Sequence, residues 1–236
     1  MANIALTVLD EYVANRPGGP STSPDRRRTR LRRGDPNIRL VRYADDFLVL
    51  VAGTREHCEV LREEVAAVLA PMGMRLSMEK TRITHINEGL DFLGWRIQRH
   101  RKRGTDRHYV YTYPAKKSVR TVARKIKTAC RTDVNQPLPA LLRQLNPMLR
   151  GWCAYFRPGV SSATFQFLRQ LVWEQAIRWI RRKHRRITWK DLRRRYCNGG
   201  WWPATEEITL FNPAKVRTTR YRYRGAVIPS PWPTMG

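Results

Sequence analysis

The chain has 236 residues, of which 42% are apolar, and it contains eight Trp and nine Tyr residues. This composition is sufficient for a packed core of one or two domains and excludes a disordered basic tail. The 46 Lys and Arg residues against 19 Asp and Glu residues give a formal charge of +27, which indicates a polyanionic partner and makes nucleic acid the first candidate.

An anionic membrane is the competing partner. No run of the sequence approaches the ~20 apolar residues of a spanning helix, and basic residues are scattered among tryptophans along the whole chain. The beginning of the chain, with Asp10 and Glu11, lacks the basic and apolar regions of a secretory signal. We therefore expect a cytoplasmic protein with no membrane partner.

The first forty residues change in character at Pro17. Apolar positions in residues 1–15 fit a helix or a buried segment equally well and end at a run of breakers. Residues 17–37 are rich in Pro, Gly, Ser and Arg, which predicts a mobile basic loop. This loop is either a solvated insertion or a segment that touches RNA.

Residues 39–52 have the layout of a β-hairpin. Two short β-rich runs, 39–43 and 47–52, flank the centre Ala44-Asp45-Asp46. Thr54 can then cap a helix whose apolar residues recur at helical spacing until Pro71 and Gly73. We expect this helix to pack on the sheet of the hairpin.

The remaining elements divide into strands and then helices, with the change near residue 114. Short strands are predicted at 82–86, 90–93, 96–99 and 109–113. Helices are predicted at 115–132, 139–157, 161–183 and 189–196. The fold class is therefore α+β, with an antiparallel sheet and helices over 1–114, a helical domain over 115–200, and an irregular basic tail over 201–236.

The four cysteines, Cys58, Cys130, Cys153 and Cys197, form no C-x-x-C pair, and the sequence has no H-x-x-H pair. Neither a zinc module nor a disulfide framework is predicted. We interpret all four as buried or incidental thiols.

Asp45 and Asp46 are the candidate metal ligands. Adjacent carboxylates in a tight turn repel each other unless a cation lies beside them, and Mg²⁺ prefers such oxygen ligands. Because neighbouring strand residues point to opposite faces, we assign the direct contact to Asp45 and a supporting one to Asp46. The alternative is an ordinary surface turn, in which Asp-Asp pairs are common.

Three motifs carry a family resemblance. Tyr43-Ala44-Asp45-Asp46 resembles the reverse-transcriptase palm motif, residues 76–81 (Leu-Ser-Met-Glu-Lys-Thr) resemble the next palm motif, and Phe92, Leu93, Gly94 and Trp95 resemble the primer grip of group II intron enzymes. The resemblance implies an RNA-directed DNA polymerase that uses Mg²⁺, an RNA template and a DNA primer. It implies catalytic roles for Asp45, Asp46 and Lys80, although Lys80 is equally well explained as a surface lysine, and core packing would also explain Phe92 and Trp95.

The same resemblance implies missing parts. Residues 2–6 resemble the end of the palm segment that follows the family's glycine-rich motif, whereas the third catalytic aspartate and the fingers would lie upstream of residue 1. We expect negligible polymerase activity from the chain alone, because phosphoryl transfer depends on placement and charge. A separately encoded N-terminal half is the expected partner. We also expect no C-terminal endonuclease.

From residue 115 onward the chain resembles the thumb, or X, domain used in maturation of intron RNA, most clearly at 151–157 (Gly-Trp-Cys-Ala-Tyr-Phe-Arg). Basic residues on the first and third helices are the candidate contacts to intron RNA, with a solvated helix face as the alternative for each. These candidates are Lys116, Lys117, Arg124, Lys125, Lys127, Arg181, Arg182, Lys183, Arg185 and Arg186.

Two further points stay open. Trp201, Trp202, Tyr221 and Tyr223 either stack unpaired bases beside neighbouring arginines or close a small core. The chain as a whole is either part of an intron-encoded polymerase and maturase or a non-catalytic RNA-binding splicing factor or decayed remnant. A general basic RNA-binding protein would require every motif match to be coincidental.

Overall fold

The computed structural model describes residues 6–77 and 79–219. Within these residues the chain forms two compact units, which meet in the sequence between His85 and Ile86. Helices and antiparallel sheets occur together, so the predicted α+β class is confirmed. The change of sequence pattern near residue 114 marks where strands give way to helices, whereas the division into compact units comes earlier in the chain.

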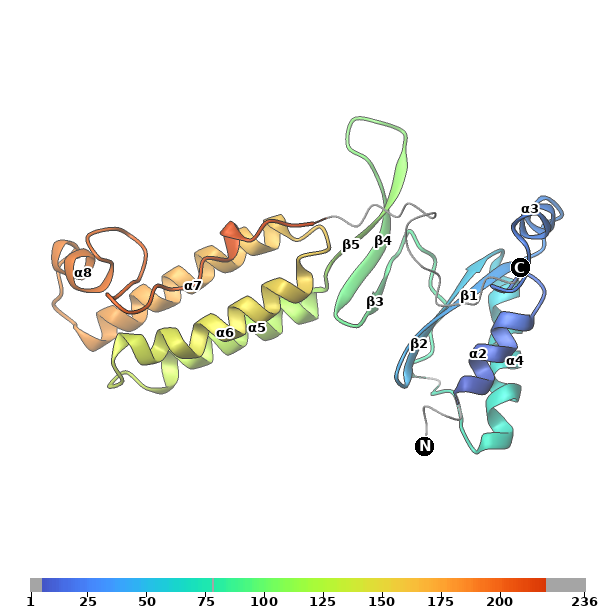
Figure 1. Ribbon diagram of the computed structural model, residues 1–236, viewed down its shortest axis with the longest axis horizontal. Helices are drawn as coiled ribbons and strands as arrows, with labels where there is room; N and C mark the ends of the chain where they lie inside the picture. Colours follow the sequence, from blue (N-terminus) through green and yellow to red (C-terminus); the bar gives the residue numbers. More distant parts are fainter. Residues whose placement is uncertain (1–5, 78, 220–236) are drawn as a thin grey trace. The chain divides into compact units, whose positions relative to one another are not determined.

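The first unit is built on a two-stranded hairpin. Strands β1 (Asn37–Tyr43) and β2 (Asp46–Ala52) pair antiparallel, with Tyr43 opposite Asp46. Ile38 and Leu40 on β1 are buried in a core that also contains residues of helices α2 (Thr7–Asn15) and α4 (Arg55–Leu69). Both helices lie beside the hairpin (Figure 1), and α4 continues into the 3₁₀ turn η1 (Ala70–Met72), so the expected packing of this helix on the sheet is confirmed.

The predicted basic loop at 17–37 is partly wrong. Residues Pro24–Arg32 form helix α3. Ser23 caps this helix by accepting a hydrogen bond from the backbone N–H of Arg26 at 3.4 Å, and Pro24 occupies the first turn. Ser followed by Pro and Asp is a helix-start signal that the loop-like composition concealed.

The strand predicted at 82–86 is also wrong. Residues 81–85 have no regular secondary structure and residues 86–88 form a turn. In the described part of the chain, the strand order is β1-β2 in one sheet and β3-β4-β5 in the other, and neither sheet takes residues 82–86. An alternating pattern forms a strand only where a neighbouring backbone pairs with it.

The second unit begins with a three-stranded antiparallel sheet of β3 (Leu90–Phe92), β4 (Trp95–Arg101) and β5 (His108–Pro114). The register places Phe92 opposite Trp95 and Trp95 opposite Pro114. Strand β5 runs into the first helix of the unit across one residue, Ala115, which is 2% exposed.

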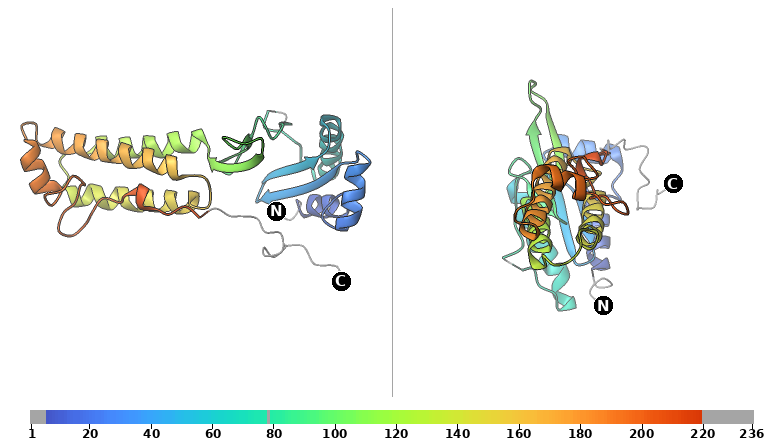
Figure 2. Two further views of the ribbon diagram at one scale, coloured as in Figure 1. Left: turned by 90° about the horizontal axis from the view of Figure 1, so that it is seen from above. Right: turned by 90° about the vertical axis from the view of Figure 1, so that its left-hand side faces the viewer.

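Four helices follow: α5 (Lys116–Thr132), α6 (Leu138–Phe156), α7 (Ser162–Lys183) and α8 (Trp189–Tyr196). Their bounds agree with the predicted ones to within one residue. Helices α5, α6 and α7 run alongside one another (Figures 1 and 2), and their apolar faces form one core that includes Ile126, Leu145 and Trp179. The spacing of apolar residues was sufficient to predict these helices because each helix buries a continuous apolar face.

Residues 201–219 are irregular, as expected, apart from the 3₁₀ turn η2 (Pro213–Lys215). This segment is nevertheless part of the helical core and runs back along α7 (Figure 1). Leu210 is 2% exposed and joins the core of α5, α6 and α7. Tyr221 and Tyr223 lie outside the described residues.

All four cysteines are free thiols, and three of them, Cys130, Cys153 and Cys197, are buried. Burial raises the pKa of Cys130 to about 11 and that of Cys153 to about 12. Among residues 6–77 and 79–219, no helix is both long and apolar enough to cross a membrane.

Candidate functional site

The Asp45-Asp46 pair lies at the tip of the first hairpin. Because Tyr43 pairs with Asp46, the turn consists of Ala44 and Asp45 alone. Ala44 has φ 55°, the left-handed region that a tight two-residue hairpin requires and that alanine adopts rarely. Both aspartates are exposed, so the fold directs two adjacent carboxylates to the surface.

Arg42 connects this turn to helix α2 by hydrogen bonds. Its guanidinium donates to Asp10 on α2 at 2.6 Å and 3.0 Å, and to the carbonyl oxygen of Ala44 at 3.2 Å. Both of the bonds to Asp10 end on one carboxylate oxygen, Oδ2, and charge-assisted hydrogen bonds of this kind are stronger than neutral ones. Helix α2 therefore positions the hairpin tip through Arg42, a role that the sequence did not reveal because Asp10 and Arg42 lie 32 residues apart.

The donor chemistry at the tip fits a divalent cation in part. Carboxylate oxygens are the hard ligands that Mg²⁺ prefers. Across the described ranges 6–77 and 79–219, however, no group of three or more His, Cys, Asp or Glu side chains could hold a metal ion. The tip itself therefore offers two carboxylates, those of Asp45 and Asp46.

Lys80, the third predicted catalytic residue, lies in a turn. Its backbone N–H donates to the carbonyl oxygen of Ser77 at 3.1 Å, and its side chain is exposed. Met78 of the same motif lies outside the described residues. The turn belongs to the same compact unit as the hairpin.

The predicted primer grip, Phe92 to Trp95, is the turn between β3 and β4 in the second unit. Leu93 and Gly94 have φ 49° and 80°, so both central residues of this two-residue turn are left-handed. The carbonyl oxygen of Gly94 accepts hydrogen bonds from the Ala115 N–H at 2.9 Å and from Ser118 Oγ at 3.0 Å. The turn is therefore held by the start of α5.

Trp95 is packed within the second unit. Its ring lies 4.8 Å from the ring of Phe156 and 5.8 Å from that of Tyr155. Gly159 lies so close that a Cβ there would be 2.2 Å from Trp95 Cζ3. Trp95 is therefore partly buried against aromatic rings of α6.

Six basic residues form one stripe along α5, and we call them the α5 stripe. The buried residues Val122, Ile126 and Ala129 lie on the side of α5 that faces the core. At 3.6 residues per turn, the stripe covers an arc of roughly 100° on the solvent-facing side of the helix. Its members are Lys116, Lys117, Arg120, Arg124, Lys127 and Arg131, all exposed.

Two members of the α5 stripe, Arg120 and Arg131, were missed by the sequence prediction, and Lys125, which was predicted, lies off the stripe. Helical spacing from Lys116 would have found both missed residues. Helix α5 also contains no acidic residue, so the stripe is a continuous positive surface about 22 Å long at 1.5 Å per residue.

The basic residues at the end of α7 have mixed roles. Arg182 donates a hydrogen bond to the carbonyl oxygen of Cys130, and Lys183 donates to those of Asn135 and Gln136 at 2.9 Å and 2.6 Å. These two side chains therefore hold the end of α5 and the following loop. Arg181 stacks on Trp189 at 4.7 Å, and Arg185 and Arg186 are exposed.

Two known protein families match separate parts of the chain. A model of reverse transcriptases (RNA-dependent DNA polymerases) matches residues 2–97, and a model of the group II intron maturase-specific domain matches residues 119–197. The chain belongs to the group II intron reverse transcriptase/maturase family. Reverse transcriptases use divalent metal ions.

Two relatives support the assignment. Protein YkfC of Escherichia coli (strain K12) is 36% identical over 132 residues, which are 50% of this chain and 35% of YkfC. Group II intron-encoded protein LtrA of Lactococcus lactis subsp. cremoris is 42% identical over 69 residues, which are 29% of this chain and 11% of LtrA. The chain thus spans about a third of the length of the first relative and about a tenth of the second.

Proposed function

We propose that this chain is an RNA-binding part of a group II intron RNA-directed DNA polymerase and maturase. Its helical domain would bind intron RNA, and its hairpin tip would supply part of a Mg²⁺-dependent nucleotidyl-transfer site. The observation that carries the RNA-binding role is the α5 stripe, which lies mostly within the segment that matches the maturase-specific domain.

The α5 stripe suits the phosphate backbone of folded RNA. Its side chains project from one rigid helix that is anchored by Val122, Ile126 and Cys130 in the core. Phosphate contacts of this kind depend on charge and spacing and carry little sequence information. The stripe therefore supports affinity for RNA duplexes, whereas recognition of a particular intron requires other contacts.

Salt dependence tests this role. Affinity for a structured RNA falls with salt, so a plot of log affinity against log salt concentration has a negative slope. Replacing Arg120, Arg124 and Lys127 with Gln should make this slope less steep by ~2–3, since each lost phosphate contact reduces its magnitude by ~0.7–0.9. The matched control replaces three arginines at the first unit's α3, Arg26, Arg32 and Arg33, with Gln.

Equal losses in the two triple variants would mean that binding follows net charge alone, and the role of the stripe would be wrong. A larger loss in the α3 variant would assign the interface to α3. Circular dichroism melting checks that each variant is folded.

For the polymerase site, Asp45 would hold Mg²⁺ directly and Asp46 would support it. The chemistry that bound Mg²⁺ supplies is activation of a 3′-hydroxyl and neutralisation of phosphate charge. Lys80 would neutralise or protonate the leaving pyrophosphate. Phe92, Leu93, Gly94 and Trp95 would contact the DNA primer, with the Gly94 backbone allowing close approach.

We propose that a further segment completes this site. In residues 6–77 and 79–85, β1 and β2 pair only with each other, and unpaired strand edges are ready to accept another strand. This supports our proposal that a separately encoded N-terminal half joins the chain and supplies the remaining carboxylate.

Primer extension on an RNA template with Mg²⁺ tests the site. We expect extension only when the chain is mixed with the N-terminal half, and we expect Asp45→Asn to abolish it while leaving RNA affinity unchanged. Absence of extension in the mixture, with salt-sensitive RNA binding intact, would instead indicate a non-catalytic maturase.

A further inference from the structure

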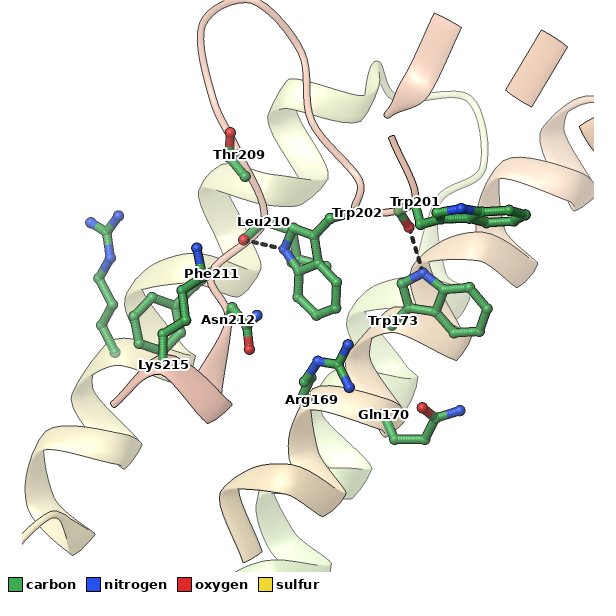
Figure 3. A pocket seen from close by; sticks show the side chains of 11 residues that line it. Arg169, Gln170, Trp173, Trp201, Trp202, Thr209, Leu210, Phe211, Asn212 and Lys215 are labelled. Atoms are coloured by element: carbon green, nitrogen blue, oxygen red, sulfur yellow. Dashed lines mark hydrogen bonds between the residues drawn. The ribbon is translucent and has the colours of Figure 1, made fainter. Parts of the chain in front are cut away.

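A groove on the second unit is not used by any of the roles above. It has a volume of about 740 Å³ and lies between α7 and the irregular segment 201–215. Figure 3 shows Trp173 and Arg169 on the helix, with Trp202 and Phe211 on the segment that faces it. Three indole rings and one phenyl ring therefore line a single opening, with Trp201 as the third indole.

The rings of the groove are held in place by their own polar groups. Trp173 Nε1 donates to the carbonyl oxygen of Trp201 at 2.7 Å, and Trp202 Nε1 donates to that of Leu210 at 2.6 Å (Figure 3). Because the indole N–H groups of Trp173 and Trp202 are satisfied within the chain, these two rings need no hydrogen bond from a ligand. Fixed aromatic rings lose little conformational entropy on binding.

The facing segment is also fixed. Asn146 on α6 is 3% exposed, and its side chain accepts from the Phe211 N–H at 2.7 Å and donates to the Thr209 carbonyl oxygen at 2.8 Å. This pairing satisfies backbone groups on both sides of Leu210, which is buried. The wall of the groove is therefore attached to α6 although it has no regular secondary structure.

The charge of the groove is positive. Arg150, Arg169 and Lys215 line it, and its lining includes no Asp or Glu. The Arg169 guanidinium lies 5.6 Å from the centre of the Trp202 ring and the Arg150 guanidinium 5.7 Å from that of Phe211. Cations thus alternate with aromatic rings at the opening.

We propose that this groove binds a single-stranded RNA segment, with an unpaired base stacked on the exposed ring of Trp201 and the adjacent phosphates at Arg150, Arg169 and Lys215. Aromatic platforms beside cations are the arrangement that captures unpaired bases. An acidic peptide would use the cations but not the indole rings, and an apolar peptide would leave the cations unpaired. This inference rests on the proposed RNA-binding function and assigns a second, different contact to it.

Binding of a 12-nucleotide oligouridine, followed by fluorescence anisotropy, tests the groove. We expect Trp201→Ala to weaken binding about 10-fold or more, in line with the loss of one base–aromatic stack. Trp201→Phe, which keeps a ring, should retain most of the affinity. Arg169→Gln should weaken binding as well, and since Arg169 is exposed this variant tests the groove without disturbing the core.

Phe167→Ala is the matched control. Phe167 is an aromatic residue on α7, the helix that carries Arg169; it is 50% exposed and is not among the groove residues. It should leave oligouridine affinity unchanged. Blunt RNA duplex should bind all the groove variants as it binds the parent chain, since a paired base cannot enter.

Unchanged oligouridine binding in both Trp201→Ala and Arg169→Gln would overturn the groove proposal, while duplex binding that still depends on the α5 stripe would leave the proposed function standing. Loss of equal size in Phe167→Ala would also overturn it, and so would competition by polyglutamate as strong as that of oligouridine. Binding of neither RNA by the parent chain would overturn both proposals.

Discussion

The hydroxyl of Tyr155 donates a hydrogen bond to the backbone carbonyl oxygen of Leu93 at 2.7 Å. The contact joins two motifs that were separate in the sequence, the turn at 92–95 and the helical segment 151–157. Leu93 has φ 49°, a left-handed conformation that costs a residue with a Cβ about 1–2 kcal/mol. The hydrogen bond helps to hold that conformation, so the helical domain stabilises the turn to which the primer role is assigned.

Tyr155→Phe should destabilise the second unit by about 0.5–1.5 kcal/mol, the net value of one hydrogen bond. Tyr109→Phe is the matched control, since Tyr109 is 43% exposed and lies on β5 away from this turn. Urea unfolding followed by circular dichroism measures both. Equal effects of the two substitutions would show that the Tyr155 hydroxyl does not support the turn.

Two glycines near this turn should respond to alanine in opposite directions. At Gly159 a Cβ would lie 2.2 Å from Trp95 Cζ3 and 2.8 Å from the Thr112 carbonyl oxygen, so Gly159→Ala should destabilise by about 1–3 kcal/mol through overpacking. At Gly151, within α6, a Cβ would meet nothing within 4 Å, and Gly151→Ala should stabilise by about 0.5–1 kcal/mol. Thermal melting of both variants shows whether each substitution raises or lowers stability. Destabilisation by Gly151→Ala would contradict the open space around Gly151.

The helices of the second unit could be predicted from the sequence because their apolar residues repeat at helical spacing and are buried together, as in Ile126 and Leu145. The hairpin at Asp45 could be predicted for the same kind of reason, since apolar strands flank a short polar turn. The strand predicted at 82–86 failed because pairing depends on a neighbour that local pattern cannot supply. Helix α3 was not predicted, because the loop-like composition of residues 17–37 was given more weight than the helix-capping signal at Ser23.

The candidate site was harder to predict for a different reason. Charge identified the basic helix, but only helical geometry separates Arg120, which lies on the stripe, from Lys125, which lies off it. Arg182 and Lys183 are predicted RNA contacts that also donate hydrogen bonds to carbonyl oxygens of the chain, and no sequence pattern indicated those bonds. The groove depends on Trp173 meeting residues about thirty positions later, and no local pattern contains that information.

Removal of the Asn146 side chain should loosen the groove wall. Asn146→Ala removes the partner of the Phe211 N–H and of the Thr209 carbonyl oxygen, which are both part-buried, and the net loss of a hydrogen bond costs about 0.5–1.5 kcal/mol each. Hydrogen exchange at residues 209–211 should accelerate and the melting temperature should fall. Asn135→Ala, at an exposed loop position, should change neither; unaltered exchange in Asn146→Ala would mean that this side chain does not fix the segment.

The buried thiol of Cys153 should make stability depend on alkaline pH. Burial raises its pKa from 9.0 to about 12, so above pH 9 the unfolded chain loses this proton while the folded chain keeps it. Stability therefore falls as pH rises, because the folded state binds more protons than the unfolded state. Between pH 8 and about 10, the urea midpoint of Cys153→Ala should fall less steeply than that of the parent chain. Burial also raises the pKa of Cys58, which is only partly buried, so Cys58→Ala should depart from the parent less than Cys153→Ala does. Parallel curves for the parent and Cys153→Ala would contradict the raised pKa.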